Sequence, residues 1–232
     1  TPQAPVCNSG NPSVVWSDSL EAGRLVGWSR GSALGATGWW WSSEKPDSAL
    51  YTKDGVQALW ADDTSNRSDT MVTMTSSVLV PSGAWFRFDH SHDLEVTDGL
   101  TGDGGLVEYS VNAGSSWHDA GSLMTDGGYN GSIYSGSGGD NPQAGKQAFT
   151  ANSFGYVSTR ADLSSLAGQN VRFRFRLATD SGNGNSTFGG WHVDRLRVYT
   201  CGTPDSVPPT VANFTTATLS LIHISEPTRP ER

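Results

Sequence analysis

The sequence has little charge, little cysteine and no long hydrophobic run. Charged residues make up 16% of its 232 residues, and cysteine occurs twice. No apolar stretch approaches the roughly 20 residues that a membrane-spanning helix requires, so no membrane span is predicted. Two thiols without a C-x-x-C pair do not suffice for a structural zinc site.

Catalytic motifs are missing as well. The chain contains neither the G-x-S-x-G turn of serine hydrolases nor the H-E-x-x-H pair of zinc peptidases. Two alternatives stay open. His90 and His92 share a strand face near Glu95 and could ligate zinc, and Glu95 with Glu108 could act as the paired acids of a glycosidase. The favoured interpretation is a chain that is not itself an enzyme.

The net charge of −8 argues against nucleic acid as a partner. A nucleic-acid-binding surface needs a basic stripe that replaces counterions along the phosphates. The one basic cluster, Arg172, Arg174 and Arg176, alternates with apolar residues and is interpreted as the solvated face of a strand.

Glycine is abundant, with 28 residues, and separates short segments in which apolar and polar residues alternate. Residues 84–95 and 171–177 alternate most clearly, and residues 49–63 suggest a strand, a turn and a strand. Residues 104–121 read as a hairpin around Asn112-Ala113-Gly114. The pattern predicts an all-β fold, an antiparallel β-sandwich of the jelly-roll type with about 10–12 strands.

The two cysteines, Cys7 and Cys201, lie just outside this patterned region. We expect the first strand (14–20) and the last (191–200) to be neighbours, so that a disulfide could join the two ends. In the chain-entropy model a disulfide across so long a loop is worth roughly 5 kcal/mol. Disulfides persist outside the cell, so the pairing favours a secreted protein.

The composition divides the chain into four parts. Residues 1–13 form a lead-in, 14–201 the β-sandwich, and 202–218 a Pro- and Thr-rich linker. Residues 219–232 contain LSLIHISEPTR, which resembles the translation of a transposase adapter used in sequencing libraries. We therefore expect this tail to be an assembly artefact.

Several motifs occur in an order that is similar to a known group of domains. They are SDSLEAG, GGLVEYSVNAGSSWHDAG, GYVSTRADLSSLAGQNVRFRFRLATDSG and GGWHVDRLRVYTC. They resemble the MAM-like accessory β-sandwich that follows the catalytic domain in secreted bacterial peptidases, namely metallopeptidases of the thermolysin, fungalysin and immune-inhibitor types, and subtilases. The resemblance implies a domain that packs on its own catalytic domain and holds substrate or a surface nearby.

Acidic residues near the first and last strands suggest a cation site. Asp18, Glu21, Asp62 and Asp194 are the candidate ligands, and calcium is the expected structural ion because it takes six to eight hard oxygens. The resemblance implies a cation here too, although Arg195 stands where the family has a second acid. A second acidic loop, with Asp93, Asp98 and Asp103, could bind another ion.

Aromatic residues suggest an alternative function as a carbohydrate-binding module. Trp39, Trp40 and Trp41 stand together in a Gly/Ser context, and Tyr129 lies in the long polar loop 124–156. Tryptophans exposed on a sandwich stack on sugar rings, and these four residues are the candidate ligand-binding set. A third alternative is a cell-surface adhesion module.

Overall fold

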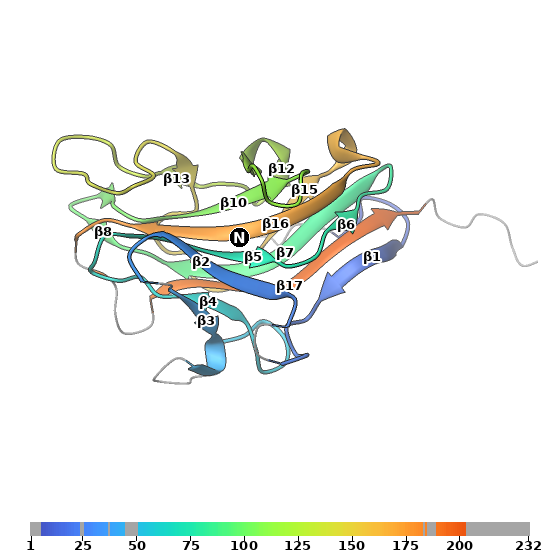
Figure 1. The fold of residues 1–232 in the computed structure, drawn as a ribbon, viewed down its shortest axis with the longest axis horizontal. Helices are drawn as coiled ribbons and strands as arrows, with labels where there is room; N and C mark the ends of the chain where they lie inside the picture. Colours follow the sequence, from blue (N-terminus) through green and yellow to red (C-terminus); the bar gives the residue numbers. More distant parts are fainter. Residues whose placement is uncertain are drawn as a thin grey trace, which may run out of the picture.

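Two antiparallel β-sheets face each other and form a sandwich, as predicted (Figure 1). The computed structural model describes residues 6–23, 26–36, 38–44, 51–182, 184 and 189–202. The predicted linker and tail, beyond residue 202, lie outside the described residues. No helix in the described ranges is long and apolar enough to cross a membrane.

The first sheet has seven strands, in the order β12-β15-β7-β17-β4-β3, with β1 also paired to β17. Their bounds are β1 Pro12–Asp18, β3 Trp39–Trp41, β4 Leu59–Ala61, β7 Ala84–Asp93, β12 Met124–Asp126, β15 Val157–Asp162 and β17 Gly190–Cys201. Of the strand, turn and strand expected over 49–63, the second strand forms as β4, residues 51–58 form no strand, and residues 49 and 50 lie outside the described residues.

The second sheet has six strands, in the order β11-β10-β16-β5-β2, with β6 paired to β16. Their bounds are β2 Trp28–Leu34, β5 Ser68–Met74, β6 Val78–Leu79, β10 Gly104–Ser110, β11 His118–Asp119 and β16 Asn170–Thr179. Two small strand pairs and three short 3₁₀ helices complete the described part. The strand pairs are β8 (Val96–Thr97) with β9 (Leu100–Thr101) and β13 (Gly131–Ser132) with β14 (Gln147–Ala148). The helices are η1 (Ser42–Glu44), η2 (Gly121–Leu123) and η3 (Ser164–Leu166).

The core lies between the two sheets and follows the alternation in the sequence. In β16, Val171, Phe173, Phe175 and Leu177 are buried, and Phe173 stacks on Phe86 of β7 with ring centroids 4.0 Å apart. Burying such a side chain stabilises the fold by roughly 1.5–3 kcal/mol. The period-2 pattern therefore places the apolar residues of both sheets in one shared layer.

The arginines of β16 point away from this core, but they are not freely solvated. Arg176 binds Asp69 of β5 through two hydrogen bonds of 2.6 Å and lies 3.3 Å from Glu108 of β10. Arg174 binds the other oxygen of Glu108 at 2.5 Å. The expected solvated face is therefore a half-buried network of ion pairs across three strands.

The ends of the chain meet as predicted. β1 pairs with β17, with Pro12 opposite Cys201, and a disulfide joins Cys7 to Cys201. The pairing of β17 with β7 shifts between Asp194 and Arg197, which marks a β-bulge. Arg195 in the bulge has a φ of 50°, a left-handed conformation that re-aims the strand.

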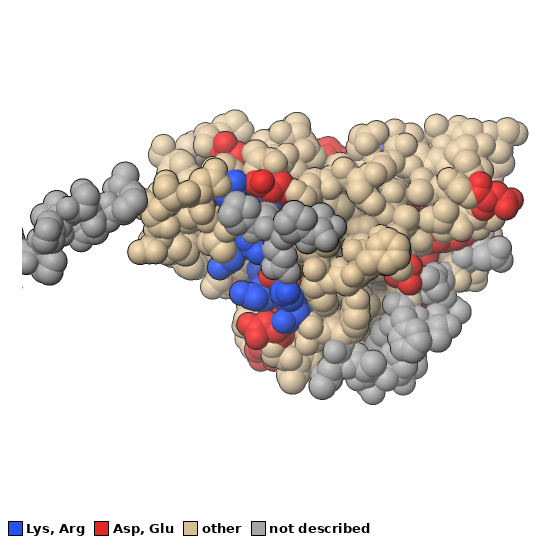
Figure 2. Space-filling view, turned by 180° about the vertical axis from the view of Figure 1, so that it is seen from behind, with Lys and Arg blue, Asp and Glu red and all other residues tan. Residues whose placement is uncertain are grey.

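Basic side chains gather in one group on one face of the molecule, next to acidic side chains (Figure 2). Across β15, β7 and β17, Arg160, Arg87 and Arg197 stand opposite one another. Arg87 lies 3.3 Å from Asp89, and Arg160 lies 2.7 Å from Asp126. Carboxylates thus offset part of the positive charge of this row.

Candidate functional site

The four predicted cation ligands do not form one group. Asp18 accepts hydrogen bonds from the Leu20 N–H (2.7 Å) and the Trp28 indole N–H (2.8 Å). Asp62 follows β4, which pairs with the first residues of β17, whereas β1 pairs with the last residues of that strand; the Asp62 N–H donates to the Gly38 carbonyl at 3.3 Å. Within the described part of the chain, the group of acids whose oxygens all lie within 4.8 Å of one another is a different one: Glu95, Asp103 and Asp180.

Glu21 and Asp194 bind the backbone in the middle of the segment 49–63, which was expected to form a strand, a turn and a strand. Glu21 Oε1 accepts the N–H groups of Val56 and Gln57, both at 2.9 Å. Asp194 Oδ2 accepts those of Lys53 (2.7 Å) and Asp54 (3.1 Å). These carboxylate oxygens accept backbone N–H groups that a neighbouring strand would otherwise bind, so residues 53–57 need no strand partner. Burial raises the pKa of Asp194 to about 6, although its backbone hydrogen bonds act in the opposite direction.

The two histidines of β7 are part of the core, and neither belongs to a cluster of metal-ligating side chains among the described residues. The His90 ring accepts a hydrogen bond from the Trp191 indole at 3.2 Å, and its Nε2 pairs with the Thr159 hydroxyl at 3.0 Å. His92 Nδ1 lies 3.0 Å from the Ala151 carbonyl. Burial lowers the pKa of both histidines, and for His90 the neighbouring charge of His92 lowers it further. Neutral imidazoles packed on aromatic rings explain why the pattern H-x-H occurs here.

Buried neutral histidines predict a loss of stability in acid. The unfolded chain binds protons below pH 6.5, whereas the folded chain resists them, so unfolding becomes easier as the pH falls below 6.5. The effect is about 1.4 kcal/mol per pH unit for each histidine until its folded pKa is reached. We expect His92→Gln to make the pH dependence of the free energy of unfolding shallower below pH 6.5, as measured by urea denaturation. The matched control is His118→Gln on exposed β11, and an equal change in both variants would refute the expectation.

The predicted aromatic platform is largely inside the protein. Trp39 and Trp41 are 1% and 3% exposed, because both point into the core from β3, so no external ligand can stack on them. Trp40 points to the opposite face, is half-buried and packs on Trp60 at 5.4 Å. Tyr129 exchanges two hydrogen bonds with the backbone of Val107. The expectation is corrected for Trp39 and Trp41, and it stays a prediction for Trp40 and Tyr129.

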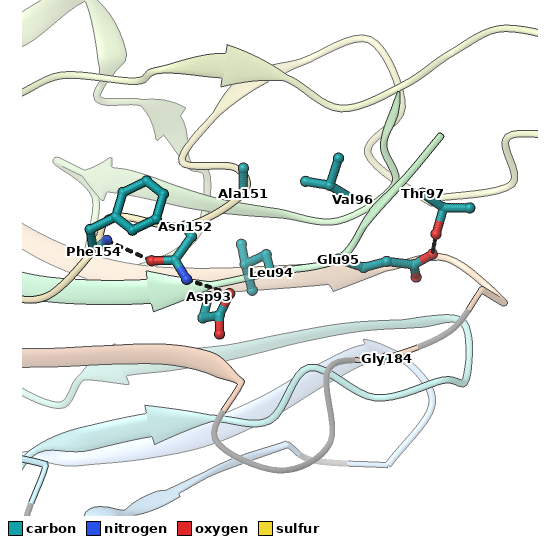
Figure 3. Close-up of a pocket in the computed structure, with 9 residues that line it drawn as sticks. All are labelled: Asp93, Leu94, Glu95, Val96, Thr97, Ala151, Asn152, Phe154 and Gly184. Carbon is teal, nitrogen blue, oxygen red and sulfur yellow. Dashed lines mark hydrogen bonds between the residues drawn. The ribbon is translucent and has the colours of Figure 1, made fainter. Parts of the chain in front are cut away.

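A pocket of about 590 Å³ lies at the end of β7 and combines polar groups with one exposed aromatic ring (Figure 3). Phe154 is 92% exposed, the most exposed of the large hydrophobic residues in the described part of the chain. Asp93, Glu95, Thr97 and Asn152 supply the polar lining. The remaining lining residues are Leu94, Val96, Ala151 and Gly184.

The loop that carries Phe154 is firmly built. Phe154 has a φ of 56°, a left-handed conformation that is unfavourable for a bulky residue. The Asn152 side chain fixes it: Oδ1 accepts the Phe154 N–H at 2.6 Å, and Nδ2 donates to Asp93 Oδ1 at 2.9 Å (Figure 3). Ser153 binds the backbone of His92 through its N–H (2.8 Å) and its hydroxyl (2.9 Å). Strain held in place by surrounding bonds is a mark of functional loops.

Phe154 was not among the residues predicted from the sequence. It lies in the long polar loop 124–156, and the pattern Asn-Ser-Phe-Gly is the local signal. Asn and Gly favour turns, so an aromatic residue between them has no strand face on which to be buried. The second alternative from the sequence, Glu95 with Glu108 as paired acids, is disfavoured because Arg174 and Arg176 neutralise Glu108.

Comparisons with known proteins give structural similarity without a family. No family model matches the chain, and no curated protein matches it. TmCBM61, solved in complex with β-1,4-galactotriose, has a TM-score of 0.46 and 9% identity over 78% of this chain and 94% of its own. The K1 cleaved adhesin domain of Lys-gingipain from Porphyromonas gingivalis has a TM-score of 0.46 and 13% identity, and the match covers 83% of this chain and 100% of the adhesin domain. The mannan-recognising carbohydrate-binding module TmCBM27 has a TM-score of 0.40 and 12% identity, and the match covers 83% of this chain and 100% of TmCBM27. No family assignment follows from similarities of this size.

Proposed function

We propose that this chain is a non-catalytic binding domain that holds a neutral carbohydrate in the pocket beside Phe154. The observation that carries the proposal is the 92% exposed ring, which a strained and well-bonded loop displays at the rim of a polar pocket. A sugar ring has one face of C–H groups that can stack on an aromatic ring. Its hydroxyl groups can donate hydrogen bonds to Asp93 and accept them from the Asn152 amide.

The charge of the pocket selects among carbohydrates. Asp93 lines it, and no Lys, Arg or His is among its described lining residues. A carboxylate beside a partly enclosed space repels an anionic ligand more strongly than it would in open water. The domain is therefore expected to prefer neutral glycans to uronic-acid polymers of the same linkage.

The parent protein is proposed to be a secreted multidomain hydrolase, with a peptidase as the expected catalytic partner. The resemblance of the sequence motifs to peptidase accessory domains supports this proposal, and the disulfide between Cys7 and Cys201 supports an extracellular location. In that setting the domain would keep the enzyme close to a glycan-bearing substrate or surface.

The test of glycan binding removes the ring while the loop keeps its shape. Asn accepts left-handed φ values, so Phe154→Asn should leave the melting temperature unchanged or slightly higher. We expect this variant to lose at least about tenfold in affinity for a neutral polysaccharide, measured by affinity electrophoresis, which corresponds to about 1.4 kcal/mol. Phe154→Tyr should retain binding.

The matched control is Leu79→Ala. Leu79 is also exposed and apolar, but it pairs with Asn170 at the start of β16, whereas the pocket lies near the end of that strand. Equal retention of the wild type and Phe154→Asn on every matrix that binds the wild type would reject the pocket as the binding site.

A further inference from the structure

Three carboxylates from separate loops converge at one end of the sandwich, beside the pocket. Glu95 follows β7, Asp103 precedes β10, and Asp180 follows β16. One oxygen of each lies within 4.8 Å of the others. Calcium holds its oxygen ligands at 2.3–2.6 Å, so oxygens on opposite sides of one ion are about 5 Å apart. The spacing of the three side chains therefore matches the oxygen shell of a single ion.

Buried oxygens in this group have no hydrogen-bond donor. Asp103 is 0% exposed and Glu95 is 8% exposed, yet Asp103 Oδ2 and Glu95 Oε2 both lack a partner. The other oxygen of each side chain is occupied: Asp103 Oδ1 accepts the Asp180 N–H at 2.8 Å, and Glu95 Oε1 accepts the Thr97 hydroxyl (Figure 3). A buried carboxylate oxygen without a partner is strongly unfavourable, so these two oxygens are explained best by a ligand that brings positive charge.

The described part of the chain supplies no ion pair to the three acids. Among the described residues, no Lys, Arg or His forms an ion pair with Glu95, Asp103 or Asp180. Asp63 is a further acidic neighbour of Asp103, and it accepts the Glu95 N–H at 2.9 Å. Burial is the main cause that raises the pKa of Asp103, and the neighbouring Asp63 raises it further.

Gly182 leaves space for the carboxylates of Asp180 and Glu95. A Cβ atom at Gly182 would lie 2.6 Å from both Asp180 Oδ1 and Glu95 Oε2, closer than real Cβ atoms approach oxygen. The Gly182 N–H also donates to Asp180 Oδ1 at 2.6 Å, which orients that carboxylate. The loop after β16 thus passes against the acids with its backbone, and a side chain there would fill the site.

We propose that Glu95, Asp103 and Asp180, with Asp63 beside them, form a calcium site that ties four loops together. The donors are all hard oxygens, which excludes a preference for soft metals. The loops that carry them differ in direction and length, and such irregular sets suit calcium, whereas magnesium requires a near-ideal octahedron and keeps its water. Because Glu95 also lines the Phe154 pocket, the ion would hold one wall of that pocket. The proposal stands independently of glycan binding.

The test is a melting experiment on the full chain after removal of metal with EDTA. Adding CaCl2 should raise the melting temperature of the wild type by about 5–10 °C at a hundredfold excess over Kd, because the ion binds only the folded state. The same concentration of MgCl2 should have a much smaller effect. Terbium(III) is the direct probe: its luminescence should rise through energy transfer from tryptophan and fall again when calcium is added.

Single substitutions of the proposed ligands test where the ion binds. Asp103→Asn and, independently, Glu95→Gln should lose the calcium shift and the terbium signal. In EDTA, Asp103→Asn should remain folded, because Asn has nearly the same size and shape as Asp. Asp98→Asn is the matched control: the residue is exposed in the same region, and its φ of 53° suits Asn, so it should respond to calcium like the wild type.

Two results would overturn the proposal. One is a wild-type protein whose melting temperature responds to neither calcium nor EDTA and which does not enhance terbium luminescence. The other is a calcium response that persists in both Asp103→Asn and Glu95→Gln but disappears in Glu21→Gln. That second pattern would place the ion at the acids near the first strand, where the sequence analysis expected it.

Discussion

Replacing Cys7 and Cys201 with serine should lower the free energy of unfolding by about 5 kcal/mol in the chain-entropy model. The loop that the disulfide closes spans 194 residues of sequence separation, so the unfolded chain gains much freedom when the bond is lost. For a domain of this size the loss corresponds to a fall in melting temperature of about 10–20 °C. Guanidinium denaturation of the oxidised protein and of the double serine variant measures it.

The location of the damage is also predicted. Most residues of β1 are exposed, so backbone hydrogen bonds to β17 and the disulfide hold this strand with little help from burial. Without the bond, amide hydrogen exchange should accelerate first in β1 and remain slow in β7 and β16. A double serine variant with an unchanged melting temperature, or one whose exchange accelerates evenly in all strands, would contradict this assignment.

Removing Arg176 should destabilise the protein by about 3 kcal/mol. Its guanidinium binds Asp69 at 2.6 Å through two nitrogens and lies 3.3 Å from Glu108, so Arg176→Leu leaves buried acids without their partner. Arg176→Lys keeps the charge but cannot form the paired hydrogen bonds, and we expect about half of the loss. Urea denaturation of the two variants gives both values.

A double variant separates the ion pair from simple packing. Arg176→Leu combined with Asp69→Asn removes the uncompensated charge and should recover at least about 1 kcal/mol of the loss. Arg172→Leu is the control: it lies on the same face of β16 but forms no ion pair among the described residues. Equal losses for Arg172→Leu and Arg176→Leu would mean that the network contributes little beyond surface packing.

The sequence was sufficient for the fold because the fold depends on local patterns. Alternation in 171–177 identified β16 and its buried face. The positions of Cys7 and Cys201 outside the pattern identified the pairing of β1 with β17. The two sheets together contain thirteen strands in the described part, a few more than expected, since pieces as short as β6 have no period to detect.

The sites could not be predicted in the same way, because they join residues that are far apart in the chain. Asp103 and Glu95 were both considered, yet neither pattern nor spacing indicates that Asp180, 77 residues beyond Asp103, completes their group. Trp39 and Trp41 were misassigned because alternation within three successive tryptophans does not reveal which face is the core. A carboxylate can bind backbone amides, as Asp194 does, or it can bind a cation. The choice depends on how the neighbouring loops are placed, and only the folded structure shows that placement.

The central claim, that the pocket beside Phe154 binds neutral carbohydrate, is tested most directly by NMR titration. The ¹⁵N-labelled domain is titrated with neutral oligosaccharides and, as a comparison, with oligouronates of matched length. We expect chemical-shift changes in residues 93–97 and 151–156 with a neutral ligand, and none in Phe154→Asn under the same conditions. Saturable shifts centred on Trp40 instead, or no shifts with any member of a broad panel, would contradict the claim.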